Sequence, residues 1–161
     1  MLPEQDSVLM SKNYVLACDP GELSGLCLIQ RDPFELVWSD ELDWIHNARR
    51  VDETLRELGG ENVDVVCERF TITVQTAKNS QQGISLEVIG QVRLLASAHG
   101  AGQITLQSPA DAKNFVTNPR LRALETWHVG GGGHANDAIR HAILRLTRTG
   151  WSDSRLLLKS K

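Results

Sequence analysis

The segment VDVVCE (63–68) limits the fold of this chain more than any other feature. Its apolar side chains would face both sides of an extended strand, which is typical of a strand covered on both faces of a sheet. The run YVLACD (14–19) is another short apolar stretch of strand formers, and it ends at Pro20-Gly21, a turn signal. The two runs predict strands of a sheet with helices packed against it.

Helical periodicities alternate with further strand-like runs along the chain. Asp43 and Ser108 are the expected N-caps of the first and third helices. Three strands in a row, followed by alternating helices and strands, predict an α/β fold with a mixed five-stranded sheet. Its first three strands would form an antiparallel meander, and helices would flank the sheet. The expected strands are 14–19, 25–30, 34–40, 63–68 and 104–107, and the expected helices are 44–58, 85–99, 109–115 and 134–147.

A length of 161 residues suits one domain, 1–161, with its own hydrophobic core. The ends, 1–13 and 150–161, and the polar segment 69–83 are expected to be flexible. No stretch is apolar enough to span a membrane, and the N-terminus lacks a secretory-signal pattern. The three cysteines form no CxxC pair, which favours reduced thiols in a cytoplasmic protein over a zinc site.

Charge is unevenly distributed along the sequence. The net charge is −3, but residues 1–111 are strongly acidic and residues 112–161 are basic. Such a gradient can arise by chance. It also fits a basic surface that meets phosphates beside a group of acids that hold metal.

Four polar residues fall where a single site could use them. Asp19 and Glu68 each end an apolar strand, so their side chains can reach one small volume. His134 and Asp137 stand three apart at the start of the last expected helix, which places both on one face. Carboxylates are the ligands that Mg²⁺ prefers. Two Mg²⁺ ions held close together can catalyse the hydrolysis of a phosphodiester bond. Acids at strand ends are also commonly solvated or act as helix caps, and spacing alone leaves both interpretations open.

Five short motifs, in order, resemble those of the RuvC-type Holliday-junction resolvases. The similarity covers about residues 14–147. The motifs are ACDPGELSGLCLI (17–29), VDVVCERF (63–70), AKNS with GQVR (77–80 and 90–93), SPADAKNFVT (108–117) and HANDAIRHAI (134–143).

The resemblance implies an RNase H-like fold and an endonuclease that cuts Holliday junctions and other branched DNA. Asp19, Glu68, His134 and Asp137 would be the catalytic and metal-binding residues, with two Mg²⁺ ions that Mn²⁺ could replace. Lys113 would contact the DNA backbone. The resemblance also implies a homodimer with the helix at 85–99 near its axis, and the sequence does not reveal a helicase partner.

Other side chains are candidates for DNA contacts. Phe70 could stack on bases at the junction, or it could fold onto the sheet as a loop hydrophobe. Glu87 is an extra acid near the expected mouth of the site, or an ordinary residue of a helix surface. Six cations could meet phosphates or be solvated: Arg69, Lys78, Arg93, Arg120, Arg122 and Arg140.

Two departures from the family pattern affect the expected substrate. The chain is acidic overall, and 118–133 has no clear counterpart and ends in four glycines, which we interpret as a hinge. These features are similar to phage-encoded relatives that cut several branched structures, which would place the protein in a bacterial or phage-infected cell. The alternatives are a nuclease for RNA or RNA–DNA hybrids, a DNA-binding protein without catalysis, and an actin- or hexokinase-like phosphotransfer domain. The last would need a second domain.

Overall fold

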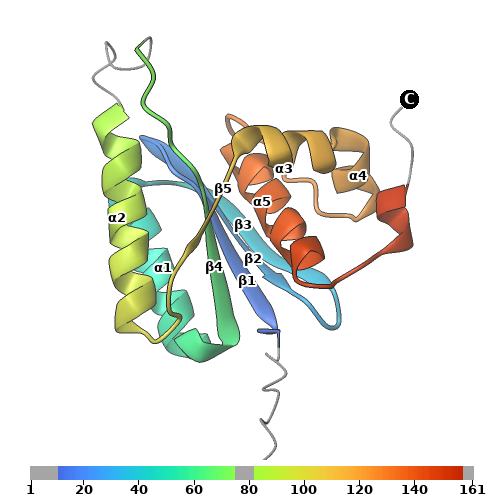
Figure 1. The fold of residues 1–161 in the computed structure, drawn as a ribbon, viewed down its shortest axis with the longest axis horizontal. Coiled ribbons are helices and arrows are strands. Elements are labelled where there is room, and N and C mark those ends of the chain that lie inside the picture. The colour runs from blue at the N-terminus through green and yellow to red at the C-terminus, as the bar shows by residue number, and fades with distance from the viewer. Residues whose placement is uncertain (1–10, 75–81, 158–161) are drawn as a thin grey trace, which may run out of the picture.

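The computed structural model describes residues 11–74 and 82–157, and of Gln82 the backbone only. In these residues the five strands come in the expected order, with five α-helices, one more than expected (Figure 1). A short 3₁₀ turn follows α1 and another follows α5. The elements are β1 (Tyr14–Asp19), β2 (Leu23–Gln30), β3 (Glu35–Asp43), α1 (Trp44–Leu58), β4 (Val63–Glu68), α2 (Gln82–Ala98), β5 (Thr105–Gln107), α3 (Pro109–Phe115), α4 (Asn118–Ala123) and α5 (His134–Arg148).

The strands form one mixed sheet in the order β3-β2-β1-β4-β5. β1, β2 and β3 pair antiparallel, whereas β4 runs parallel to β1 and β5 parallel to β4. This confirms the predicted five-stranded α/β sheet. β2 and β3 are longer than expected: β2 begins at Leu23, and β3 continues to Asp43, the residue that also caps α1.

Alternate side chains of each inner strand enter two separate cores. Leu16 and Cys18 of β1 pack with α1 and α2, whereas Val15 and Ala17 pack with α5. In β4, Cys67 joins the first core and Val66 the second. Figure 1 shows α1 and α2 on one side of the sheet and α3, α4 and α5 on the other. Both faces are therefore covered, as the apolar runs predicted.

The ends of α1 follow the signals in the sequence. Asp43 accepts hydrogen bonds from the backbone N–H groups of Ile45 and His46, each at 3.0 Å, which confirms it as the N-cap. At the other end, Gly59 adopts φ 75°, a backbone conformation that stops a helix at little cost in glycine.

Helix α4 was not predicted. Asn118-Pro119 looks like a loop signal, but proline is equally at home in the first turn of a helix. Leu121 and Leu124 are buried beneath the short helix and join the core around α5. Their burial outweighs the weak local preference, since packing stabilises a helix this short.

The chain beyond α5 also differs from expectation. A loose end was predicted from residue 150, yet Trp151 stacks on Phe34 with ring centroids 4.6 Å apart, and Leu156 is buried. Residues 150–157 therefore pack against the body of the protein. The helices in the described ranges include none that is long and apolar enough to cross a membrane. The segment 75–81 lies outside the described residues.

The start of α5 rests directly on β2 at Gly25. A Cβ atom at Gly25 would overlap the carbonyl oxygen of His134 and lie 2.7 Å from the backbone nitrogen of Ala135. Gly25 is also the register partner of Asp19 across β1 and β2. The absence of a side chain at Gly25 thus lets α5 bring His134 next to Asp19.

We expect Gly25→Ala to lower the free energy of unfolding by about 1–3 kcal/mol, because the added methyl group must push α5 from the sheet. Urea unfolding would measure the change. Gly83→Ala is the control, since a Cβ atom there meets nothing within 4 Å. Equal stabilities of the two variants would contradict the close approach.

Candidate active site

The sheet brings Asp19 and Glu68 together. Cys18 of β1 is the register partner of Cys67 of β4, so the two acids follow at the next position of neighbouring parallel strands. Side chains alternate along a strand, and the acids continue the rows of Ala17 and Val66 that face α5. Asp19 and Glu68 therefore point to the same face, beneath the first turns of α5.

Asp19 is buried, with a relative exposure of 7%. Burial, and then the negative charge of Glu68, raise the pKa of Asp19 to about 6, even though the hydrogen bond from His134 works in the opposite direction. Asp137 adds a smaller effect that also raises this pKa. Asp19 is thus close enough to both Glu68 and Asp137 to be affected by their charges.

His134 reaches Asp19 from the N-terminus of α5. Its Nδ1 lies 2.9 Å from Oδ2 of Asp19. An ionised carboxylate can only accept hydrogen bonds, so Nδ1 of His134 donates whenever Asp19 is charged. In a neutral ring this leaves Nε2 with a lone pair that could bind a metal or accept a proton from water.

Asp137 lies one turn along α5 and is paired with two cations. Its Oδ2 is 3.2 Å from Nζ of Lys113 on α3, and its Oδ1 accepts a hydrogen bond of 2.6 Å from Arg140. Arg140 also donates to the carbonyl of Val116, at 2.9 Å. Lys113, predicted to contact DNA, is thus directly beside the acids, and its side chain is 55% exposed.

Glu68 is held by a buried pair of polar side chains that the sequence analysis missed. Oε2 of Glu68 lies 3.0 Å from Nε2 of His141, and Nδ1 of the same ring lies 3.0 Å from Oε1 of Gln107. His141 and Gln107 are 0% and 1% exposed. A signal was available, because Gln107 ends β5 as Asp19 ends β1 and Glu68 ends β4.

Glu41 of β3 organises the glycine run before α5, a role that nothing local in the sequence indicated. Its carboxylate accepts backbone hydrogen bonds from Gly132, Gly133 and Ala135 at 2.7, 2.9 and 3.1 Å. Partial burial would raise the pKa of Glu41, but these hydrogen bonds and His134 outweigh it and the pKa is lowered. Glu41 is thus a distant N-cap for α5, at a run interpreted from the sequence as a hinge.

Hard oxygen donors dominate this group of residues, as Mg²⁺ prefers. Burial and the charge of Glu68 raise the pKa of Asp19, and a cation would favour its charged form. The donor set therefore suits a divalent metal in its chemistry. The described residues nevertheless include no group of three or more His, Cys, Asp or Glu side chains arranged as a ready metal cage. Each acid is instead turned to its own partner: Asp19 to His134, Glu68 to His141, and Asp137 to Lys113 and Arg140.

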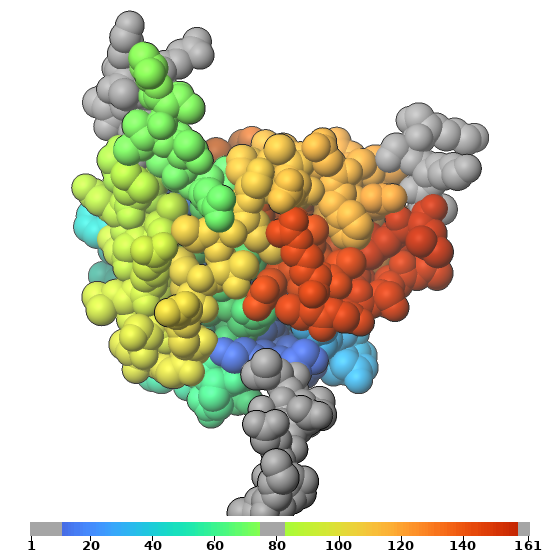
Figure 2. Space-filling view, viewed as in Figure 1, coloured from blue at the N-terminus to red at the C-terminus, as the bar shows by residue number. Residues whose placement is uncertain are grey.

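The segment after β4 carries two of the predicted DNA contacts. Arg69 is exposed, and its backbone N–H donates to the carbonyl of Gln107 at 2.7 Å. Phe70 is half-buried. Figure 2 shows this segment, in green, rising above the body beside the amber surface of α3. Arg69 and Phe70 thus follow directly after Glu68, at the end of the sheet where the acids lie.

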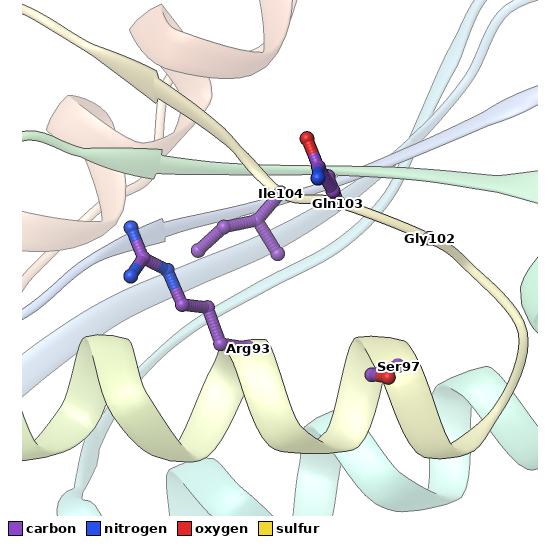
Figure 3. Close-up of a pocket in the computed structure, with 5 residues that line it drawn as sticks. All are labelled: Arg93, Ser97, Gly102, Gln103 and Ile104. Carbon is purple, nitrogen blue, oxygen red and sulfur yellow. The ribbon is translucent and has the colours of Figure 1, made fainter.

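One other predicted DNA contact is not brought to the acids. Arg93 of α2 lines a cavity of about 560 Å³ together with Ser97 and residues 102–104 (Figure 3). Residues 102–104 lead into the start of β5, whereas the acids lie at the ends of β1 and β4. Glu87 is an exposed residue of α2, as expected. Lys78 lies outside the described residues.

The basic last third is less free than its charge suggested. Every described cation between 112 and 157 has a partner. Arg120 and Arg122 lie over the rings of Phe115 and Trp127, at 5.5 and 4.0 Å from the ring centroids. The other five form ion pairs: Lys113 and Arg140 with Asp137, Arg145 with Asp64, Arg148 with Asp111, and Arg155 with Asp153. Five of these seven cations would therefore have to exchange an acid for a phosphate in order to contact DNA.

Solved structures provide a direct comparison. The fold is similar to "T. thermophilus RuvC in complex with Holliday junction substrate", with a TM-score of 0.62 and 18% identity over 85% of this chain and 96% of that chain. It is also similar to "Thermus thermophilus RuvC structure", with a TM-score of 0.61 and 18% identity over 86% and 97%. The chain has the RuvC fold. No protein-family model matches the sequence, and no curated protein matches it.

The RuvC fold is RNase H-like, with a mixed five-stranded sheet flanked by helices. This confirms the fold that the sequence motifs implied. At 18% identity the likeness establishes the arrangement of the elements. The roles of Asp19, Glu68, His134 and Asp137 depend on the geometry described above.

Replacing Asp19 with asparagine should stabilise the metal-free protein at high pH. The folded protein keeps the Asp19 proton up to about pH 6, whereas the ordinary pKa is 3.8. Between these values the folded state binds more protons, so the free energy of unfolding falls as pH rises. Asparagine cannot ionise, so the free energy of unfolding of the variant does not fall with pH for this reason.

We expect Asp19→Asn to be about 1–3 kcal/mol more stable than the original protein at pH 8, and the difference should vanish near pH 4. Urea unfolding in the presence of a chelator would measure it. A difference that is the same at both pH values would contradict the buried, repelled carboxylate.

Proposed function

We propose that this protein is a divalent-metal-dependent endonuclease that cuts four-way junctions and other branched DNA. The observation that carries the proposal is the placement of Asp19 and Glu68 at the ends of two register-paired strands, under a helix that supplies His134 and Asp137. The RuvC fold of the chain supports it, since one of the similar structures is described with a Holliday junction substrate.

In this proposal, Asp19, Glu68 and Asp137 supply oxygen ligands, and His134 supplies a nitrogen. Bound Mg²⁺, or Mn²⁺ in its place, would activate a water and stabilise the leaving oxygen of the phosphodiester, with two ions per site. His134 keeps Nδ1 on Asp19, which fixes the ring and leaves Nε2 for the metal or for the proton of the attacking water. Asp137 would have to leave Lys113 or Arg140 to bind metal.

Lys113 would then be able to bind DNA. When Asp137 turns to the metal, the ammonium group of Lys113 loses its partner beside the reaction centre, and a DNA phosphate can replace the carboxylate. Its half-exposed position on α3 allows this exchange. Arg69 and Phe70 would meet the same DNA, Arg69 through phosphate and Phe70 by stacking on a base. Lys78 and Arg93 stay as predicted DNA contacts.

We also propose that two copies act together through α2. Leu86 and Leu94 are 44% and 70% exposed on this helix. Together with Gly90 and Ala98 they repeat every four residues and form one exposed stripe on the helix. A Cβ atom at Gly90 would meet nothing within 4 Å, so another helix could approach closely there. A homodimer would give two sites for the two opposed strands of a junction.

A nuclease assay with labelled substrates tests the activity. We expect the protein with Mg²⁺ to nick a four-way junction, and Asp137→Asn to lose at least about 100-fold in rate while still binding the junction, because the lost carboxylate holds metal. Asp52→Asn makes the same change at an acid of α1 that pairs with His99 and Arg56, and it should keep full activity.

The choice of substrates separates the alternatives. Preference for an RNA–DNA hybrid over branched DNA would favour a hybrid nuclease. Junction binding without any metal-dependent cleavage would indicate a DNA-binding protein without catalysis. Equal cleavage by Asp137→Asn and the original protein would contradict the proposed site.

Light scattering on a sizing column tests the dimer. We expect Leu94→Glu to convert a dimer to a monomer, since a buried, unpaired carboxylate on the proposed interface is costly. Val129→Glu, a change of the same kind at a residue that is 85% exposed, should stay dimeric. A monomeric original protein, or a dimer that Leu94→Glu leaves intact, would exclude this interface.

A further inference from the structure

His141 is the most deeply buried ionisable side chain at the site. It lies on α5 one turn beyond Asp137 and is 0% exposed. Its Nε2 is 3.0 Å from Oε2 of Glu68, and its Nδ1 is 3.0 Å from the side chain of Gln107. Both ring nitrogens therefore have polar partners, although leucine would fill a similar volume without any need for them.

The proton on Nε2 can be assigned from the neighbours of the ring. An ionised Glu68 only accepts hydrogen bonds, so Nε2 of His141 must donate to it. As placed, Oε1 of Gln107 faces Nδ1, and Nε2 of Gln107 is buried without a partner in the described structure. Exchanging the amide oxygen and nitrogen would let Gln107 donate to Nδ1 of a neutral ring. In either orientation the N–H of Nε2 points at Glu68.

From this arrangement we propose that His141 is a positioning residue that holds one oxygen of Glu68 and so presents the other oxygen to the metal. The side chain of Gln107 fixes the ring of His141. Gln107 is in turn fixed at the end of β5, where its backbone carbonyl accepts a hydrogen bond from the backbone N–H of Arg69. Glu68 is 22% exposed in its side chain, so its free oxygen can reach the open side of the site.

This inference rests on the proposed function. It adds that the geometry of Glu68 depends on a helix residue that binds no metal itself. A hydrogen bond from outside the ligand shell restricts how a ligating carboxylate can rotate, and removing such a partner typically weakens metal affinity or activity by 10–100-fold.

Two measurements test the proposal. The first titrates the protein with Mn²⁺ alone and measures the free ion by electron paramagnetic resonance. The second measures the rate of junction cleavage as a function of Mg²⁺ concentration. His141→Gln keeps an amide N–H the same number of bonds from the backbone as Nε2. His141→Asn moves the donor one bond closer to the backbone, and His141→Leu removes it. His99→Leu is the control. His99 lies away from the site, and its Nε2 forms a similar pair with Oδ1 of Asp52 at a distance of 2.7 Å.

We expect His141→Leu and His141→Asn to bind Mn²⁺ about 10–100-fold more weakly and to need correspondingly more Mg²⁺ for half-maximal cleavage. His141→Gln should stay close to the original protein, and so should His99→Leu. Junction affinity without metal should not change. If His141→Leu does not fold, the comparison of glutamine with asparagine still decides the question.

The inference is overturned if His141→Gln is as weak as His141→Asn, which would indicate a purely structural ring, or if all variants bind Mn²⁺ equally. Failure of the proposed function looks different. In that case the original protein binds no Mn²⁺ at the site, or binds it and cuts no branched DNA.

Discussion

Two carboxylates fixed at the ends of neighbouring strands repel each other, and the rest of the site is arranged around that repulsion. Neighbouring strands are about 5 Å apart, where two full charges at an effective dielectric constant of about 20 repel by about 3 kcal/mol. The register of β1 with β4 keeps the backbones of Asp19 and Glu68 close, because the residues before them, Cys18 and Cys67, are paired in the sheet. Only a neighbouring positive group or a retained proton can offset this cost.

Helix α5 supplies most of the offsetting groups. His134 binds Asp19, His141 binds Glu68, and Arg140 joins Lys113 at Asp137. Three features fix the helix in place: Gly25 gives it room on the sheet, Glu41 holds its N-terminus, and its apolar side fills one of the two cores. Burial and the charge of Glu68 still raise the pKa of Asp19, and a divalent cation bound beside it would favour the charged carboxylate.

Local patterns in the sequence predict the parts of this site that depend on local structure. Strand runs that end in an acid place Asp19 and Glu68, and a spacing of three places His134 and Asp137 on one face of a helix. The shared face toward α5 follows from the alternation of side chains. Contacts between residues far apart in the sequence cannot be predicted from such local patterns. Glu41 is 91 and 92 residues from the two glycines that it binds, and His141 and Glu68 are 73 apart, so no short window of sequence contains either pair.

Helix α4 and the packed C-terminal segment show the same limit. Asn118-Pro119 is compatible with both a loop and a helix start, and only the core beneath Leu121 decides between them. The basic character of the last third was visible in the sequence. The sequence did not show that these cations are paired with acids and aromatic rings, because pairing depends on which surfaces the fold brings together.

Anomalous diffraction from crystals of the protein soaked in Mn²⁺ is the most direct test of the central claim, that the fold gathers Asp19, Glu68 and Asp137 into a metal site. We predict an anomalous peak among these three carboxylates, with Asp137 released from Lys113 or Arg140. Mn²⁺ bound only elsewhere on the protein, or an Asp137 that keeps both Lys113 and Arg140 at saturating Mn²⁺, would contradict it.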